Sequence, residues 1–287
     1  MAAPPLQMLF SAIVAASALT YNNGLGATPQ MGWNSWNSIG GNIDEAFAKS
    51  IGDGLVSSGL AAIGYVYVCL DDGVMLPNRS ADGKLIADPS KFTNGSLATL
   101  AAYLHSKQLK LGVYSSGGTV TCMHRAGTHG HEKIDAETWA QWGVVRPATS
   151  AVILLLLLLP PPSPPSFANP SPPQDYAKLD WCGNVEPAKT WYPKMSKALN
   201  DTGRHIFFAM CEWGDESVWQ WGSGYANSWR TWRDICNYWT TNSTVNPYCA
   251  GVSEVIQQNQ QYHAYGRPYG WNVRIDPAAA AAAARCR

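Results

Sequence analysis

The stretch YVYVCLDD (65–72) is an apolar run of buried-strand length that closes on two acidic residues. LKLGVYSS (109–116) follows the same plan, and so do DYAKLDWC (175–182), HIFFAMCEW (205–213) and SWRTWRD (228–234). Apolar runs of this length are typical of strands buried on both faces, as in a parallel sheet. These runs therefore decide the expected fold class, which is α/β.

Three amphipathic patterns predict helices between the strands, with apolar residues three or four positions apart. They are Phe47, Ile51 and Leu55; Leu97, Leu100 and Leu104; and Trp191, Met195 and Leu199, the last ended by Gly203. Alternating strands and helices imply βα units around a parallel sheet.

The spacing of the strand ends exposes one irregularity. Ends are expected near Trp36, Asp72, Ser115, Asp180, Trp213, Asp234 and Asn272. The interval between Ser115 and Asp180 is too long for one βα unit, and it contains the Leu- and Pro-rich residues 145–174. We interpret 145–174 as a disordered insertion, with a functional loop as the alternative. Its apolar part, 151–159, is too short to span a bilayer, which disfavours a membrane-tethered module.

The net charge and the N-terminal residues indicate where the protein is located. Lys+Arg and Asp+Glu number 20 each, so no net charge attracts nucleic acid or an anionic membrane. Residues 1–18 end in Ala-Ser-Ala and are predicted to be a secretory signal peptide, a plain apolar segment being the alternative. We therefore expect a secreted protein of the extracellular space, cell wall or vacuole. Four predicted glycosylation sequons fit that route: Asn78, Asn94, Asn200 and Asn242.

Carboxylates gather at four of the expected strand ends and alternate with Trp, a residue of which the chain has 13. In a parallel βα barrel such ends meet at one face and form the active site. Carboxylates accept hydrogen bonds from vicinal hydroxyls and Trp rings cover the apolar face of a pyranose, so the pattern predicts a sugar pocket. Retaining glycoside hydrolysis needs an ionised nucleophile and a protonated acid. Lys178 should lower the pKa of Asp180, and Asp234 is placed to be the acid.

Seven motifs occur in an order that resembles a known family. They are MGWNSWN (31–37), LDDG (70–73), LKLGVYSSGGTVTC (109–122), KLDWC (178–182), CEWG (211–214), SWRTWRDI (228–235) and GWN (270–272). Together they resemble the barrel of glycoside hydrolase family 27, the melibiase-type α-galactosidases. The resemblance implies a (β/α)8 TIM barrel in two parts, 24–144 and 175–275.

The resemblance also implies site roles. Asp180 would be the nucleophile that forms a glycosyl-enzyme, and Asp234 the acid/base. The implied sugar-binding residues are Trp33, Asp71, Asp72, Lys178, Cys211, Glu212, Trp213 and Arg230. Asp71 and Asp72 would hold the 4- and 6-hydroxyls. The Cys-Glu-Trp form near the 2-position favours α-galactose over N-acetylgalactosamine, and no cofactor or metal is implied.

The cysteines depart from the family pattern in part. The family's disulfide after the Asp pair is missing, because Gly41 and Gly73 occupy its two positions. The resemblance implies that the other family disulfide, Cys122–Cys182, is kept. Cys236 and Cys249 are predicted to pair as well, and Cys69 is expected to be a buried thiol.

The match to the family ends after Asn272, where the chain continues VRIDPAAAA. The eighth strand and the family's C-terminal β-sandwich have no counterpart, and 276–287 is a low-complexity tail. We therefore expect a barrel that is incomplete after strand seven and a chain that is weakly active or inactive as written.

Three other functions remain open. A sugar-binding protein without catalysis would use the same pocket, and an α-N-acetylgalactosaminidase is a remote alternative. A metal enzyme could use HGHE (129–132), although the remaining His are scattered and no His-Glu-x-x-His motif exists.

Overall fold

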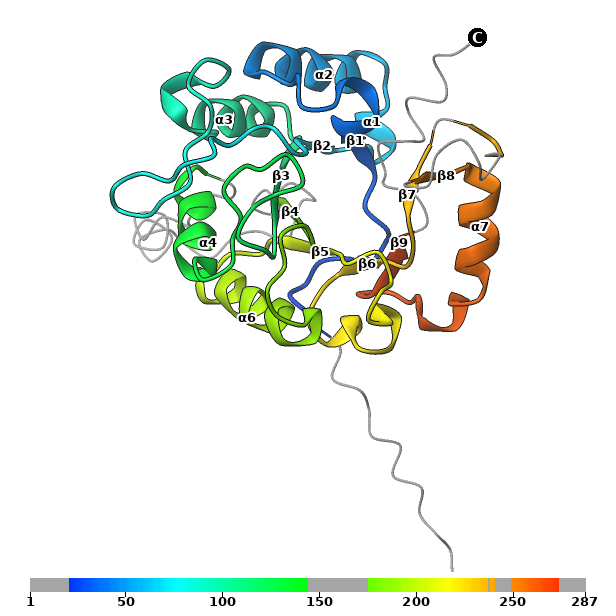
Figure 1. Cartoon of the computed structure of the whole chain (residues 1–287). Helices are drawn as coiled ribbons and strands as arrows, with labels where there is room; N and C mark the ends of the chain where they lie inside the picture. The colour runs from blue at the N-terminus through cyan, green and yellow to red at the C-terminus, as the bar shows by residue number, and fades with distance from the viewer. Residues whose placement is uncertain (1–20, 144–174, 237, 241–248, 274–287) are drawn as a thin grey trace, which may run out of the picture.

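The computed structural model describes residues 21–143, 175–236, 238–240 and 249–273. Seven strands form one parallel sheet in the order β1-β2-β3-β4-β5-β6-β9. The strands are β1 Gly32–Asn34, β2 Tyr67–Cys69, β3 Lys110–Ser116, β4 Tyr176–Asp180, β5 Phe207–Cys211, β6 Ser228–Arg230 and β9 Trp271–Val273. The sheet curves into an incomplete, TIM-like barrel with helices on its outside (Figure 1). The predicted parallel α/β fold is confirmed.

The helices lie where the sequence patterns predict them, but in one helix a different side faces the core. They are α1 Trp36–Ile39, α2 Glu45–Ser57, α3 Ala98–Ser106, α4 Glu132–Gln141, α6 Ala188–Asp201 and α7 Val252–Gln260. In α2 the core-facing side includes Ala48, Gly52 and Leu55, whereas Phe47 is 38% exposed. Gly52 packs closely there: a Cβ would lie 2.8 Å from a methyl group of Leu104 on α3.

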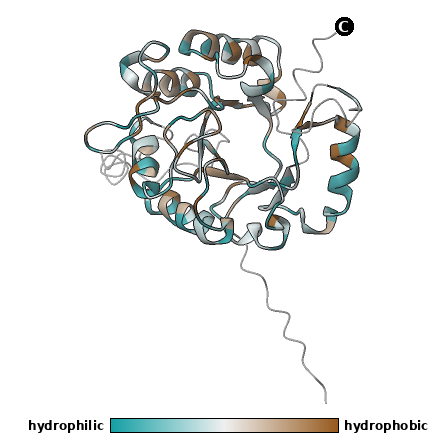
Figure 2. Cartoon of the chain, in the orientation of Figure 1, coloured by the Kyte–Doolittle hydropathy of each residue, from teal (hydrophilic) through white to brown (hydrophobic). Residues whose placement is uncertain are grey.

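The core lies between the sheet and the outer helices. Trp191, Tyr192, Met195 and Leu199 of α6 are fully buried against it. Figure 2 shows β5 in hydrophobic colours and α7 as largely hydrophilic. The helix at the end of the described chain therefore contributes little apolar surface to this core.

The predicted strand 228–234 is divided in two. β6 ends at Arg230, and Asp234 belongs to β7 (Asp234–Ile235), which pairs with β8 (Cys249–Ala250) outside the main sheet. The chain turns after Arg230, and in this turn the guanidinium donates to the Trp232 carbonyl at 3.0 Å. Asp234 is thus set beside the barrel opening rather than within the sheet.

Among the described residues β1 pairs only with β2, and β9 pairs only with β6. The last strand is tied to the chain before β1 by the Trp271 indole, which donates to the Gly26 carbonyl at 2.7 Å. Segments 1–18, 145–174 and 276–287 of the predicted organisation lie outside the described residues. No described helix is long and apolar enough to cross a membrane.

Both predicted disulfides are present, Cys122–Cys182 and Cys236–Cys249, and Cys69 is a buried cysteine outside these two bridges, as expected. Gly41 and Gly73, which stand where the family has a disulfide, lie against each other: a Cβ at position 73 would be 2.8 Å from the Gly41 Cα. The two positions are therefore neighbours in space, and the bridge is replaced by direct backbone packing.

Three of the four predicted glycosylation sites, Asn78, Asn94 and Asn200, are exposed. Asn242 lies outside the described residues. Glycosylation itself stays a prediction.

Candidate active site

The carboxyl ends of the parallel strands bring the predicted site residues to one edge of the barrel. Lys178 and Asp180 lie two apart on β4 and so share a face. The strand register sets Tyr114 of β3 opposite Lys178, and Cys211 of β5 opposite Asp180. These side chains come from distant parts of the sequence and meet because the strands are parallel and in register.

Asp71 is the partner of Lys178. The Lys178 ammonium lies 2.8 Å from Asp71 Oδ2, and both side chains are almost completely buried. The Asn34 amide donates to the same oxygen at 2.8 Å, while the Asp71 backbone N–H donates to Ser35 Oγ at 2.9 Å. The first and second strands thereby fix the position of the lysine on the fourth.

Asp180 is held by two donors at the end of β4. The Tyr114 hydroxyl donates to Oδ2 at 3.0 Å, and the Trp181 backbone N–H donates to Oδ1 at 2.9 Å. Burial raises the pKa of Asp180, and the charges of Lys178 and Arg230 only partly oppose that rise. Lys178 lowers this pKa as expected, but burial outweighs it, so the pKa of Asp180 is raised rather than held low.

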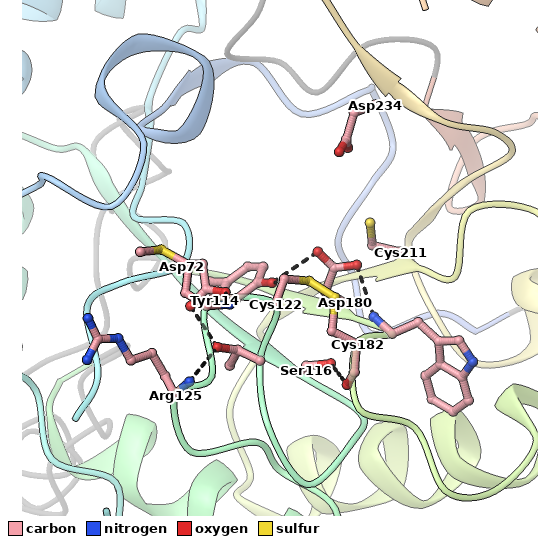
Figure 3. Close-up of a disulfide and its surroundings, with 12 residues drawn as sticks. Asp72, Tyr114, Ser116, Cys122, Arg125, Asp180, Cys182, Cys211 and Asp234 are labelled. Atoms are coloured by element: carbon pink, nitrogen blue, oxygen red, sulfur yellow. Dashed lines mark hydrogen bonds between the residues drawn. A yellow bond between two sulfur atoms is a disulfide. The ribbon is translucent and has the colours of Figure 1, made fainter. Parts of the chain in front are cut away.

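Asp234 faces the same opening from β7. Its side chain is 48% exposed, and Arg230 Nη1 lies 2.5 Å from Oδ1. Figure 3 shows Asp234 pointing toward the region of Asp180 from the opposite side. Burial alone would raise the pKa of Asp234, but Arg230 and then Lys178 outweigh it and hold the pKa below its usual range. A raised pKa was expected for an acid, so this direction is also opposite to the prediction.

We expect Arg230→Gln to raise the pKa of Asp234, because it removes the main cation while the burial remains. A ¹³C-carboxyl NMR titration measures that pKa directly. Arg233→Gln is the matched control, since Arg233 packs over the Trp232 ring and should shift the pKa much less. An unchanged pKa in Arg230→Gln would contradict the assignment.

Arg230 also connects to β5. Its Nη1 donates to the Cys211 thiol sulfur at 3.2 Å, and Cys211 is buried. Burial raises the pKa of Cys211, so the group is a neutral thiol at neutral pH. Cys211 lies on β5, which is between β4, the strand that supplies Asp180, and β6, the strand that supplies Arg230.

Asp72 is held by the segment after β3, whereas Glu212 and Trp213 lie in the turn that follows β5. Asp72 accepts from the Thr121 hydroxyl and from the Met123 backbone N–H, each at 2.8 Å. Both oxygens of Glu212 accept backbone N–H groups, and burial raises the pKa of Glu212 to about 7. Trp213 is partly buried and adopts a positive φ of 59°. The sugar-binding roles of these three stay predictions, and the contacts of Glu212 fit a residue that stabilises its turn.

The prediction that Trp33 lines the pocket is corrected. Trp33 is 7% exposed and packs in the core, 6.1 Å from the Phe47 ring. Side chains alternate along a strand, and Asn34 takes the face toward Asp71. The pocket at the opening is instead lined by Trp36, together with Lys178, Arg230 and Asp234.

Sequence reasoning placed Trp36 and Tyr114 at the strand ends without giving them a role in the site, and it missed Asn34. Each sits at a strand end that the sequence had already marked. The face each side chain takes was the missing information, and the pairing register supplies it.

The alternative metal site at residues 129–132 is not assembled. His131 Nδ1 lies 3.1 Å from the His129 carbonyl, and Glu132 accepts from the Trp191 indole at 2.7 Å. Within the described ranges, the three possible metal ligands that come together are Cys122, Asp180 and Cys182.

Comparison with known proteins adds the decisive observation. The family model described as alpha galactosidase A (Melibiase_2) matches residues 28–147 and 166–277. The chain belongs to the melibiase family, glycoside hydrolase family 27.

Plant members of the melibiase family are clear relatives. Alpha-galactosidase 2 of Arabidopsis thaliana is 40% identical over 258 residues, which is 89% of this chain and 55% of that protein. The alpha-galactosidase of Coffea arabica is 44% identical over 76% of this chain and 50% of its own length. This melibiase chain thus spans about half the length of the curated relatives it matches.

Solved structures agree. Alpha-galactosidase I of Mortierella vinacea superposes with a TM-score of 0.73 at 32% identity, covering 89% of this chain and 60% of that one. The Saccharomyces cerevisiae alpha-galactosidase solved with raffinose gives a TM-score of 0.72 at 30% identity, covering 88% and 53%. The incomplete barrel is therefore the barrel of the melibiase family.

The ion pair at the centre of this melibiase barrel should matter for stability. Lys178→Met leaves Asp71 buried without its ammonium partner, and we expect a loss of about 3–5 kcal/mol in the free energy of unfolding. Denaturant titration measures the loss. Lys49→Met, which removes the partly exposed pair with Glu45, is the control and should cost about 0.5 kcal/mol or less. Equal effects of the two variants would contradict the argument.

Proposed function

We propose that the protein containing this chain is a retaining α-galactosidase that removes terminal α-linked galactose. One observation supports this above all: Asp180 and Asp234 approach one opening from β4 and β7, with Lys178 and Arg230 beside them. Hydrolysis with retention needs one carboxylate to attack and one carboxyl to protonate the leaving oxygen. The family relatives and the raffinose-bound yeast structure support an α-galactoside as substrate.

In the proposed mechanism Asp180 attacks the anomeric carbon while Asp234 donates a proton to the departing oxygen. The C–O bond to the leaving group breaks as the bond to Asp180 forms. Asp234, now ionised, takes a proton from water, and that water releases the sugar from Asp180. Tyr114 and the Trp181 N–H orient the attacking carboxylate throughout.

The pKa directions add a condition to this mechanism. The productive form has Asp180 ionised and Asp234 protonated, which is the reverse of their order in the unliganded site. Only part of the enzyme is in that form at any pH, and its share is greatest between the two pKa values. A sugar hydroxyl that takes a hydrogen bond from Arg230 would loosen its hold on Asp234 and raise that pKa.

Selectivity for galactose over its 2-acetamido relative is also proposed. Cys211 and Trp213 close the β5 side of the site, and Cys211 is 1% exposed. Because Cys211 is buried, it leaves no room at this side of the site for an acetamido group. A secretory route to the extracellular space, wall or vacuole is proposed alongside, supported by the two disulfides.

The test uses the 287-residue chain with and without residues 145–174. Deletion leaves Trp142, Gly143, Val144 and Asp175 between α4 and β4, which is a common length for such a connection. We expect the shortened chain to release nitrophenol from the p-nitrophenyl α-galactoside and not from the β-anomer, at least as fast as the intact chain. Proton NMR should show α-galactose as the first product.

Other results separate the alternatives. Galactose binding without release would identify a sugar-binding protein, and release of N-acetylgalactosamine would identify the acetamido-sugar enzyme. A folded chain that neither binds nor hydrolyses α-galactosides would refute the proposal.

A further inference from the structure

A disulfide lies directly beside the proposed nucleophile. Figure 3 shows the Cys122–Cys182 bridge next to Asp180, and the Tyr114 hydroxyl that holds Asp180 is 3.5 Å from the Cys122 sulfur. We propose that reduction of this bridge creates a site for a soft divalent cation, Zn²⁺ or Cd²⁺, with Cys122, Cys182 and Asp180 as ligands. Cation binding stands on geometry alone, whereas its inhibitory effect rests on the proposed function.

The ligand atoms already have suitable spacing. One donor atom from each of the three residues lies within 4.8 Å of the other two. With Zn–S near 2.3 Å and Zn–O near 2.0 Å, the donors around a tetrahedral zinc are about 3.3–3.8 Å apart. Breaking the S–S bond lets the sulfurs separate to this distance by small side-chain rotations. Two thiolates and a carboxylate form a donor set that zinc accepts readily.

The backbone that presents the two cysteines is held without the disulfide. Ser116 Oγ donates to the Cys182 carbonyl at 2.6 Å, and the Thr119 N–H donates to the Gly183 carbonyl at 3.0 Å. On the other side, the Met123 N–H next to Cys122 donates to Asp72 at 2.8 Å.

Gly118 packs so closely on Gly183 that a Cβ at position 118 would lie 2.1 Å from its carbonyl carbon. Together with the hydrogen bonds, this contact keeps the two chain segments together. We therefore expect the thiols to stay together after reduction.

The bridge is open to reagents and to cations. Cys122 is exposed and Cys182 partly exposed, and exposed disulfides are the labile ones. A water-soluble phosphine reduces the bond: the S–S bond breaks, phosphorus gains an oxygen from water, and the two hydrogens of that water become the two thiol protons. The cation then displaces both protons as it binds the thiolates.

Occupation of the site would have one functional consequence. The cation takes an oxygen of Asp180, which is the atom that the proposed mechanism uses to attack the sugar. Hydrolysis should therefore be inhibited by the cation only after reduction, and a bound galactoside should compete with it.

The test measures cation binding directly. The full chain is prepared with Cys286→Ser, because that thiol lies outside the described residues. Oxidised and phosphine-reduced forms, freed of reductant, are titrated with Cd²⁺ by calorimetry and by ultraviolet thiolate-to-cadmium absorption. We expect one tight site per chain in the reduced form and none in the oxidised form. Cys122→Ser should weaken binding at least about tenfold.

Two controls make the result decisive. The double variant Cys236→Ser with Cys249→Ser removes the other reducible pair and should bind Cd²⁺ as tightly as the parent after reduction. Circular dichroism follows the fold. The proposal is overturned if reduction unfolds the chain, if the reduced form binds no more tightly than the oxidised one, or if the 236/249 variant alone loses the site. If the reduced chain binds Cd²⁺ but does not hydrolyse α-galactosides, the result contradicts the proposed function and does not contradict this inference.

Discussion

Replacing Asp180 by Asn should abolish turnover, with a loss of about 10⁴-fold or more in kcat/KM for an α-galactoside. An amide cannot form the glycosyl-enzyme, yet its one oxygen can still accept from the Trp181 N–H while its NH2 group donates to the Tyr114 hydroxyl oxygen. The fold should therefore survive. Initial rates on the p-nitrophenyl α-galactoside with the chain lacking residues 145–174 measure the loss.

Asp82→Asn is the matched control, because Asp82 is exposed and interacts with Ser80 and Lys84. It should keep the parent rate. A second measurement applies if the parent enzyme is too slow for reliable rates. A fluorinated galactosyl fluoride should label one carboxylate, and mass spectrometry should locate the label in the peptide that contains Asp180. Label on another residue, or an Asp180→Asn variant within tenfold of the parent, would rule out the assignment.

Replacing Asp234 by Asn should slow hydrolysis by about 10²–10⁴-fold for substrates with poor leaving groups, because the general acid is lost. Substrates with a dinitrophenyl leaving group depart without a proton and should be hydrolysed at nearly the parent glycosylation rate. Azide, which needs no base, should restore turnover and yield α-galactosyl azide. Steady-state kinetics on a series of aryl galactosides give the leaving-group dependence.

Asp215→Asn is the control for Asp234, since Asp215 is an exposed carboxylate near the same edge. It should show no leaving-group dependence beyond the parent. If Asp234→Asn slows all leaving groups equally, the residue has a role in binding or folding rather than in proton transfer.

Much of the sheet could be predicted from sequence, because buried parallel strands are near-continuous apolar runs and the carboxylates at their ends mark one face. Asp180 and Lys178 were recognised in this way. The partner of Lys178 was not, because Asp71 is 107 residues away and reaches it only through the register of three strands. The two pKa directions also differ from the expected ones, because burial raises the pKa of Asp180 despite Lys178 and because Arg230 lowers that of Asp234.

Short strands limit what a pattern can decide. β1 has three residues, so alternation could not say which of Trp33 and Trp36 would face the pocket. The turn at Arg230 also had no sequence signal: a run that looked like one strand became β6 and β7, and Asp234 came to lie outside the main sheet. The long apolar runs predicted the strands correctly. The sequence did not predict strand ends that depend on single side-chain contacts.

The long sequence separations within the site have a consequence for how the molecule acquires activity. Tyr114 and Asp180 are 66 positions apart, and Lys178 and Asp71 are 107 apart, so each pair joins strands from well-separated parts of the chain. Parallel pairing at such separations makes loop closure slow, so we expect the site to be among the last features to form during folding. Recovered enzymatic activity would then report the arrival of the whole sheet, well after helical signal has returned.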